Sequence, residues 1–357
     1  MPEAGTFRLF TEGDELYTAM LASIAAAQQQ ILLESYIFAD DEIGRQFAAA
    51  LIERAASGID VRLHLDAAGS MFWVSQRLIR HLKQNGVRVR WFHRWDWRHP
   101  WRYNRRNHRK LLVTDRRDAY IGGFNIHREN SRRVYGESRW RDTHVSFHGG
   151  LIDAATDLFN DFWQGRRRRR LPPAPQNHSI LLSNFRHGAR RYLNGSFASM
   201  LSHATQSICL TTPYFVPDRR TQRLLLEAAQ RGVDVRLLVP RKNDVRLVQW
   251  ASRAAYGRLL ENGVRIYEYL PRVLHAKTIV VDANYATVGT SNVDYRSFFL
   301  NYELNLFTRD LLLCRQLQTT FMDDLEHAEQ VHCEQWQHRF WGDRALELAG
   351  WMARRLL

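Results

Sequence analysis

The chain has 357 residues, of which 45% are hydrophobic and 25% charged, a composition typical of a globular protein large enough for two domains. Lys and Arg outnumber Asp and Glu by 51 to 37, and the resulting charge of +14 indicates a polyanionic partner, either nucleic acid or an anionic membrane. The odd number of cysteines (Cys209, Cys314 and Cys333) argues against a disulfide framework and for a reducing compartment. We recognise neither a secretory signal nor a stretch of about 20 apolar residues, so we expect neither export nor a membrane-spanning helix.

The sequence repeats its own pattern of elements. An apolar run typical of a strand follows a helical segment in each half, and two further segments in each half join a helix that ends at Gly to a strand of alternating polarity. Helix–Gly–strand units repeated in this way predict an α/β fold. The matching pairs are Gln30–Phe38 with Gln206–Phe215, Gly58–Leu65 with Gly232–Val239, and Asn85–Phe92 with Asn262–Tyr269.

The first half contains a segment that the second half lacks. Gly86 and His108 are 22 positions apart, whereas the matching Gly263 and His275 are 12 apart. The additional residues mix tryptophan with arginine, and two interpretations remain open. One is a surface loop with a few buried rings; the other is a loop in a membrane interface, where Trp suits the headgroup depth and Arg meets phosphates. The membrane-binding candidates are Trp95, Trp97, Trp101 and Arg102.

A histidine and a lysine follow this segment at the spacing of one strand face. His108 and Lys110 stand at the start of a short apolar run with β-branched residues, and residues two apart on a strand point to the same side. Asp115 lies at odd offsets from both, so we expect it to support the following turn rather than to transfer protons. Asn125 comes after a Gly-containing turn that lets the backbone bend back towards the strand end.

A run of arginines and prolines separates the two halves. Residues 165–177 read GRRRRRLPPAPQN, and neither five arginines nor three prolines in four residues can continue a packed element. The run is either a solvated linker or an anion-binding contact. The sequence therefore predicts a first half at 1–165, a linker at 166–177, a second half at 178–335 and a basic, aromatic C-terminal helix at 336–357.

The second half repeats the pattern of His, Lys, Asp and Asn in full. His275, Lys277, Asp282 and Asn292 each lie 167 positions after their counterparts. Two converging histidines can supply a nucleophile and an acid–base group to a phosphodiester, while two lysines and two asparagine amides stabilise its non-bridging oxygens, as a metal does elsewhere. A lysine on the same face as each histidine would repel a divalent cation, so we expect no metal and no cofactor.

The C-terminal stretch combines tryptophan and arginine in a partly amphipathic pattern. Trp336–Leu357 has the composition of a helix that lies in a membrane interface. Gly342 and Gly350 weaken a single continuous helix, and the alternative is a terminal helix that docks on its own domain.

Two copies of H-x-K-x4-D followed by G-x-x-N resemble the motifs of the phospholipase D superfamily. The resemblance implies an α/β fold of two pseudo-symmetric α/β/α sandwich halves, with the active site at their interface. It also implies that one histidine forms a phosphohistidine, while the other protonates the leaving alcohol and deprotonates the incoming one. By analogy with the family, we expect His108 to attack and His275 to act as acid and base.

The similarity narrows to bacterial cardiolipin synthases and covers most of residues 7–345. Asn292–Phe307 and Trp140–Gly149 are similar to the segments that follow each motif in those enzymes. Cardiolipin synthases of this kind move a phosphatidyl group from one phosphatidylglycerol to a hydroxyl of another. By motif position, Asp142 and Glu303 would be the carboxylates that orient the two histidines.

The resemblance also predicts the setting of the reaction. We expect lipid substrates and an anionic phospholipid membrane as partners, a peripheral place on the cytoplasmic face of the bacterial inner membrane, and no obligate partner chain. Three alternatives remain: a phospholipase D that uses water, a nuclease of the same superfamily, and an inactive lipid-binding scaffold. The tryptophan-rich segment and the duplicated motif argue against the nuclease, and the eight intact motif residues argue against the scaffold. One departure from the superfamily pattern is Gly123, where serine is frequent.

Overall fold

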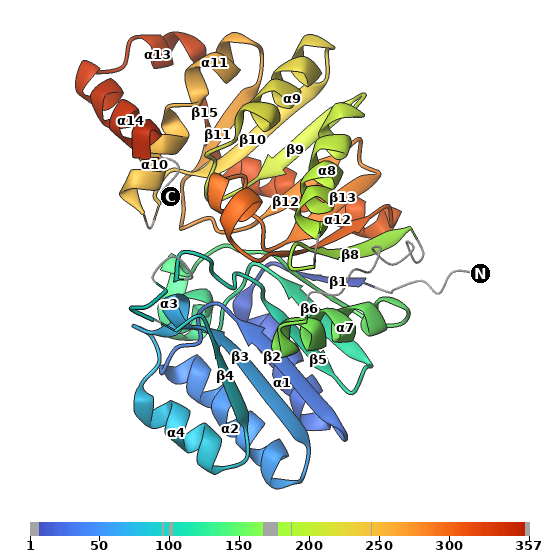
Figure 1. The fold of residues 1–357 in the computed structure, drawn as a ribbon. Coiled ribbons are helices and arrows are strands. Elements are labelled where there is room, and N and C mark those ends of the chain that lie inside the picture. The colour runs from blue at the N-terminus through green and yellow to red at the C-terminus, as the bar shows by residue number, and fades with distance from the viewer. Residues whose placement is uncertain are drawn as a thin grey trace.

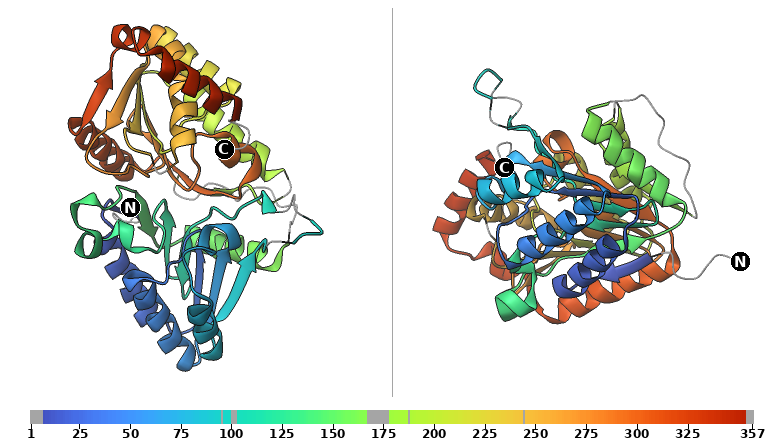
Figure 2. Two further views of the ribbon diagram at one scale, coloured as in Figure 1. Left: turned by 90° about the vertical axis from the view of Figure 1, so that its left-hand side faces the viewer. Right: turned by 90° about the horizontal axis from the view of Figure 1, so that it is seen from below.

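The computed structural model describes residues 7–94, 96–99, 103–166, 178–186, 188–243 and 245–353. Each half of the chain forms a mixed β-sheet, and the two halves are stacked on one another (Figure 1). Helices cover the faces of both sheets, as the two views of Figure 2 also show. The predicted α/β fold in two similar halves is thereby confirmed.

The first half builds a seven-stranded sheet in the order β1-β7-β6-β5-β2-β3-β4. Its strands β2, β3 and β4 run parallel, whereas β5, β6, β7 and β1 pair antiparallel. Parallel neighbours need crossover connections, which α2 and α4 supply. The elements are β1 (Phe7–Phe10), α1 (Gly13–Ala26), β2 (Gln30–Ser35), α2 (Glu42–Ala56), β3 (Asp60–Asp66), α3 (Ala67–Ser70), α4 (Gln76–Gln84), β4 (Arg88–Phe92), β5 (Leu111–Thr114), β6 (Asp118–Gly122), the 3-10 helix η1 (Arg128–Asn130), α6 (Arg132–Tyr135), the 3-10 helix η2 (Gly136–Ser138), β7 (His144–Phe147) and α7 (Leu151–Gln164).

The second half builds an eight-stranded sheet in the order β15-β11-β10-β9-β12-β13-β14-β8. Its parallel strands are β9, β10 and β11, and its other pairs are antiparallel. The elements are β8 (Ser179–Ser183), α8 (Ala189–Ser202), β9 (Ser207–Thr211), α9 (Arg219–Gln230), β10 (Asp234–Pro240), α10 (Arg246–Arg253), α11 (Tyr256–Glu261), β11 (Arg265–Tyr269), β12 (Thr278–Val281), β13 (Tyr285–Gly289), the π-helix η3 (Arg296–Leu300), β14 (Leu304–Thr308), α12 (Leu311–Glu326), β15 (Ala328–Val331), α13 (Cys333–Gln337) and α14 (Trp341–Ala353).

The two sheets repeat the same strand order. When β8, β14, β13, β12, β9, β10 and β11 are set against β1, β7, β6, β5, β2, β3 and β4, every neighbour matches, and β15 is an additional strand at one edge. Gly58 and Gly232, with φ of 85° and 87°, lie two residues after the ends of the helices before β3 and β10. Glycine adopts this left-handed conformation at little cost. The repeat in the sequence is therefore a repeat in topology.

An apolar core joins the two halves. Alternate side chains of β2 point to opposite faces, so Ile31 and Leu33 pack under the outer helices while Leu32 joins a cluster that contains residues of both sheets. That shared cluster includes Phe159 of α7 and Phe321 of α12. Burial of this common apolar surface holds the halves together and so fixes the distance between their histidine segments.

The C-terminal segment packs on the second half. Helix α14 lies against α10 (Figure 1), and a Cβ on Gly350 would lie 2.6 Å from the backbone nitrogen of Ala251. Trp336 is buried, whereas Trp341 is exposed. The structure thus has the docked arrangement that the sequence left open. Residues 354–357 and most of the predicted linker, residues 167–177, lie outside the described residues. No helix in the described part of the chain is long and apolar enough to cross a bilayer.

Candidate active site

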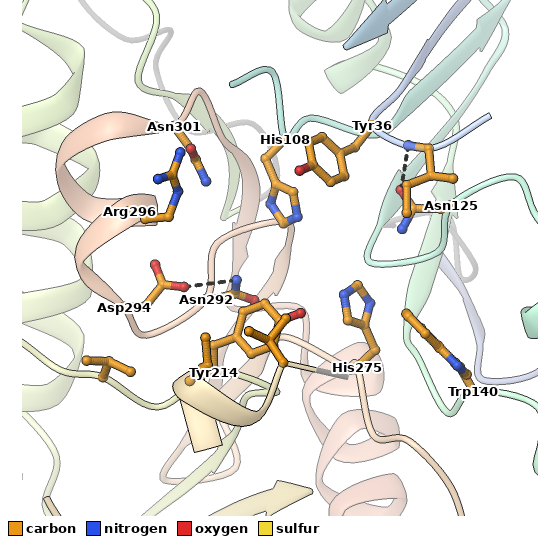
Figure 3. Close-up of a pocket in the computed structure, with 14 residues that line it drawn as sticks. Tyr36, His108, Asn125, Trp140, Tyr214, His275, Asn292, Asp294, Arg296 and Asn301 are labelled. Atoms are coloured by element: carbon orange, nitrogen blue, oxygen red, sulfur yellow. Dashed lines mark hydrogen bonds between the residues drawn. The ribbon is translucent and has the colours of Figure 1, made fainter. Parts of the chain in front are cut away.

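A pocket of about 270 Å³ opens between the two halves. The imidazole rings of His108 and His275 point towards one another across it (Figure 3). The pocket thus brings together one histidine from each motif. Its lining residues are Tyr36, Ile37, His108, Asn125, Trp140, Tyr214, Val216, Val245, Val248, His275, Asn292, Asp294, Arg296 and Asn301.

His108, just before β5, is held by both halves. Its backbone nitrogen donates to the carbonyl of Tyr302 (3.0 Å), whose own nitrogen donates to the carbonyl of Arg106 (2.8 Å). The imidazole Nδ1 lies 3.0 Å from Oε2 of Glu303, and the Tyr36 ring meets the imidazole edge-on with 5.0 Å between centroids. A carboxylate of the second half therefore orients the histidine of the first.

His275, just before β12, shows the reverse arrangement. Its backbone nitrogen donates to the carbonyl of Arg141 (2.7 Å), whose nitrogen donates to the carbonyl of Val273 (2.8 Å). The imidazole Nδ1 lies 2.5 Å from Oδ2 of Asp142, and the Trp140 ring lies 5.2 Å away, centroid to centroid. A carboxylate of the first half orients this histidine, so the two pairs cross the interface.

Burial and nearby lysines keep both imidazoles neutral. Burial, followed by the charge of Lys277, lowers the pKa of His275 to about 3, and burial with Lys110 lowers the pKa of His108. Burial alone would raise the pKa of Asp142, but Lys277 and His275 outweigh it and hold this pKa below its usual range. A carboxylate that accepts from Nδ1–H leaves the lone pair of Nε2 available for chemistry.

Two buried lysines make the site suited to an anion. Lys110 Nζ donates to the carbonyl of His108 (3.0 Å), and Lys277 Nζ donates to the carbonyl of His275. Burial, followed by the charge of Lys277, lowers the pKa of Lys110 to about 7. A bound phosphodiester would raise the pKa of Lys110 again, because its negative charge favours the ammonium form.

The two motif asparagines present different groups. Asn125 Oδ1 accepts from the backbone nitrogen of Ile37 (3.1 Å), which leaves its NH2 group on the pocket side (Figure 3). Asn292 Nδ2 instead donates to Oδ2 of Asp294 (3.1 Å). Each motif predicts an amide donor in the pocket. Asn125 directs its donor there, whereas Asn292 directs its donor to a carboxylate.

The motif aspartates lie outside the pocket and bind backbone amides. Asp115 accepts from the backbone nitrogens of residues 28–30 at 2.6 to 2.9 Å, and Asp282 accepts from those of residues 205–207 at 2.7 to 2.9 Å. Although burial opposes it, these hydrogen bonds lower the pKa of both carboxyl groups. Each aspartate ties the turn after one strand to the start of its neighbour, which is the supporting role that the odd offsets predict.

Two small residues adapt the site to its two carboxylates, and the sequence pattern did not reveal them. A Cβ on Gly123 would lie 1.9 Å from Oδ1 of Asp142, so a serine does not fit here. At the matching place, Thr290 donates its hydroxyl to Oε2 of Glu303 (2.5 Å) and accepts from the nitrogen of Leu304 (2.9 Å). The shorter acid thus faces glycine and the longer acid faces threonine.

Several pocket residues carry no motif of their own. The aromatic ones are Tyr36, Trp140 and Tyr214, and the polar ones are Asp294, Arg296 and Asn301. The sequence marked them only as parts of larger segments: Asp294, Arg296 and Asn301 lie in Asn292–Phe307, Trp140 lies in Trp140–Gly149, and Tyr36 and Tyr214 lie in the repeated pair Gln30–Phe38 and Gln206–Phe215. These segments meet only in the folded chain.

Of the four membrane-binding candidates, the structure describes Trp97, which is 75% exposed. The segment that follows β4 projects from the molecule (Figure 2). Trp95, Trp101 and Arg102 lie outside the described residues.

Neither metal ligands nor disulfides mark this site. In the ranges that the structure describes, no three His, Cys, Asp or Glu side chains are grouped so as to hold a metal ion. The three cysteines are free thiols, and burial raises the pKa of Cys209 to about 11 and that of Cys314 to about 12. The expected absence of a cofactor stays a prediction.

Comparison with known proteins gives a consistent picture. The family model described as "Cardiolipin synthase, PLD-like domain" matches residues 20–147 and 197–325. A cardiolipin synthase of Halalkalibacterium halodurans is 36% identical over 356 residues, covering 95% of this chain and 70% of the relative. The major cardiolipin synthase of Bacillus subtilis is 34% identical over 351 residues, covering 94% and 72%.

Two solved structures share the fold at low sequence identity. A phosphatidylserine synthase of Haemophilus influenzae aligns with a TM-score of 0.76 at 15% identity, covering 99% of this chain and 96% of that one. A polyphosphate kinase of Porphyromonas gingivalis aligns with a TM-score of 0.62 at 14% identity, covering 92% and 49%. At such identities the likeness concerns the fold alone.

Proposed function

This chain belongs to the cardiolipin synthase family with a phospholipase-D-like domain, and from that membership we propose that it transfers a phosphatidyl group from phosphatidylglycerol to a hydroxyl of another phospholipid, forming cardiolipin. The observation that carries the proposal is the crossed pairing of His108 with Glu303 and of His275 with Asp142 in one pocket. A transfer in two half-reactions needs a nucleophile and an acid–base group around one phosphorus atom. One oriented, neutral imidazole can attack, and the other can serve as the acid once the bound anion favours its protonation.

In the first half-reaction His108 is the nucleophile. Its Nδ1–H is held by Glu303, so Nε2 attacks the phosphorus and forms a P–N bond while the P–O bond to the leaving alcohol breaks. His275 must carry a proton on Nε2 at this step and gives it to the leaving oxygen; the negative charges of the bound phosphodiester and of Asp142 favour this protonated form. The choice of His108 over His275 follows the family resemblance.

In the second half-reaction His275 acts as the base and His108 is the leaving group. The acceptor hydroxyl gives its proton to His275, its oxygen forms the new P–O bond, and the P–N bond to His108 breaks. Lys110 and Lys277, with the amide of Asn125, would hold the non-bridging oxygens, whose charge grows in each transition state. Lys110 and Lys277 act strongly here because both are buried, where charges are poorly screened.

The same proposal includes a membrane surface. The charge of +14 favours anionic lipid headgroups, and exposed side chains such as Trp97 suit the interface. We infer a peripheral protein at the cytoplasmic face of a bacterial inner membrane, whose pocket receives headgroups from the bilayer.

The test is an assay with phosphatidylglycerol vesicles in the presence of EDTA, with lipid products identified by mass spectrometry. The wild type is expected to form cardiolipin and glycerol, and His108→Ala is expected to form neither because the P–N bond cannot form. Continued turnover in EDTA would support chemistry without a divalent cation.

Two outcomes would contradict the proposal. Phosphatidic acid without cardiolipin would make the enzyme a hydrolase that uses water. No lipid product, combined with cleavage of single-stranded or duplex DNA that His108→Ala abolishes, would make it a nuclease.

A further inference from the structure

The two walls of the pocket differ in chemistry although the fold repeats. Both walls carry aromatic rings, Tyr36 and Trp140 from the first half and Tyr214 from the second. The charged pocket residues Asp294 and Arg296, and the amide of Asn301, all come from the second half (Figure 3). Because the two sheets have the same strand order, this difference does not follow from the fold. It indicates that the two sides of the pocket receive different parts of the substrates.

Asp294 is a buried carboxylate in the wall from the second half, and the residue at the matching position of the first half is not a carboxylate. Asp294 is 5% exposed, and its Oδ1 accepts from the backbone nitrogen of Ser297 (2.7 Å) while Oδ2 accepts from Nδ2 of Asn292 (3.1 Å). The matching position, 167 residues earlier, is His127, which pairs with Glu129 at 2.5 Å and is not part of the pocket lining. Burial raises the pKa of Asp294 to about 6, so near neutral pH it remains mainly an acceptor.

Two amide oxygens of residues in the same pocket wall lack a donor in the described part of the chain. Since an ionised carboxylate only accepts, Asn292 directs its NH2 group to Asp294 and its Oδ1 away from it. This Oδ1 and Oδ1 of Asn301 are buried, and no described group donates to either. Buried acceptors are normally paired because an unpaired one costs free energy. These atoms therefore suit a ligand that donates hydrogen bonds.

Hydroxyl groups fit this set of acceptors, and phosphate does not. The charge of Asp294 would repel phosphate oxygens, which are better held by Lys110 and Lys277 beside the histidines. The guanidinium of Arg296 on the same wall donates to the side chain and the carbonyl of Asn104. A water molecule or a simple alcohol has a single oxygen, which it would also need for attack on the phosphorus. A polyol can place one hydroxyl on these acceptors while its neighbouring hydroxyl attacks.

We propose that Asp294, Asn292 and Asn301 form the subsite for the acceptor alcohol, a glycerol-type polyol, and that this subsite selects such an acceptor over water and over simple alcohols. The inference rests on the proposed phosphatidyl transfer. The bound hydroxyl aims its neighbour at the phosphorus; the neighbour's proton passes to one imidazole as its oxygen forms the P–O bond. The P–N bond to the other imidazole breaks, and its electron pair returns to the ring nitrogen.

The experiment compares acceptors for one phosphatidyl donor. Phosphatidylglycerol vesicles are incubated with equal concentrations of deuterated glycerol and 1-propanol, and mass spectrometry measures deuterated phosphatidylglycerol, phosphatidylpropanol and phosphatidic acid. In Asp294→Asn the ratio of glycerol product to propanol product is expected to fall about tenfold, because one charge-assisted hydrogen bond is lost. Total donor consumption is expected to fall less than the ratio.

A second variant and a matched control keep the test decisive. Asn301→Ala removes one acceptor while its backbone hydrogen bonds remain, and it is expected to lower the same ratio even if Asp294→Asn folds poorly. His127→Asn, at the matching place in the other half, is expected to leave the ratio unchanged. An unchanged ratio in both subsite variants would overturn the proposal. A wild type that makes no cardiolipin but discriminates between the two alcohols would overturn the proposed function and leave the subsite standing.

Discussion

At the scale of single residues, each histidine works with a carboxylate that the sequence places far from it. His108 and Glu303 are 195 positions apart, and His275 and Asp142 are 133 apart. A carboxylate on Nδ1 fixes the tautomer in which Nε2 can attack or accept a proton. Replacing the acid by its amide keeps the shape but allows the wrong tautomer.

We expect Asp142→Asn to lower kcat for cardiolipin formation by about 10³- to 10⁴-fold, because a wrong tautomer has an effect of this size in a Ser-His-Asp triad. The measurement is turnover on phosphatidylglycerol vesicles, together with the thermal midpoint of unfolding. Asp153→Asn is the matched control, since its exposed carboxylate pairs with Arg116 on the surface. A loss below tenfold in Asp142→Asn would show that the carboxylate does not orient His275.

At the scale of elements, the turn after α3 is connected to a residue that lines the pocket. Met71, Phe72 and Trp73 are 49%, 86% and 41% exposed, although all three are large and apolar. The turn is fixed to the pocket wall because Ser70 Oγ donates to the carbonyl of Tyr36 (2.9 Å). Exposed aromatic side chains beside a lipid site suit contact with a membrane.

The segment between β10 and α10 is the counterpart in the second half. Its Val245 lines the pocket and is 40% exposed. Figure 1 places α3 and α10 on the same side of the molecule, in different halves. Both segments therefore expose apolar side chains on that side of the molecule.

We expect Phe72→Ser to weaken binding to phosphatidylglycerol vesicles about tenfold, which corresponds to losing the burial of much of one aromatic side chain. Vesicle co-sedimentation measures the binding. Turnover of a short-chain, monomeric phosphatidylglycerol should stay unchanged because Phe72 does not line the pocket. Leu311→Ser, at an exposed site on α12, is the control. Equal losses in both variants would contradict a role for the Met71–Trp73 turn in membrane binding.

At the scale of the whole molecule, one buried ion pair fixes the two halves next to the site. Arg141 of the first half donates to both carboxylate oxygens of Asp324 on α12, at 3.0 and 2.8 Å, and both residues are buried. Arg141 also accepts from the backbone nitrogen of His275 and directly precedes Asp142. Stability and catalysis are therefore linked at this residue.

We expect Asp324→Ala to lower the free energy of unfolding by about 3–5 kcal/mol, because it leaves the buried guanidinium of Arg141 without its partner. Urea denaturation followed by circular dichroism measures the change. Replacing both partners in Arg141→Met with Asp324→Leu should recover most of the stability, since an apolar pair has no desolvation penalty. A single variant within 1 kcal/mol of the wild type would indicate that the ion pair contributes little.

The sequence by itself determined the architecture and the chemical groups of the site. Residues two apart on a strand share a face, glycine ends helices, and a pattern repeated at a constant offset of 167 must repeat in the fold. These rules are local, so they predicted two α/β halves and the motif residues. They also predicted that Asp115 supports a turn, because its odd offset points it away from the histidine face.

Only the tertiary structure decided which groups meet. The crossing of His108 with Glu303 and of His275 with Asp142 depends on how the two halves pack, and the shared apolar core that sets this packing has no local signature. The fit of Gly123 to Asp142 depends instead on the pairing of β6 with β7 within the first half, and the sequence pattern does not carry that pairing either. Contacts between segments more than 100 residues apart follow from burial of surface on both halves at once, and a local pattern carries no record of that.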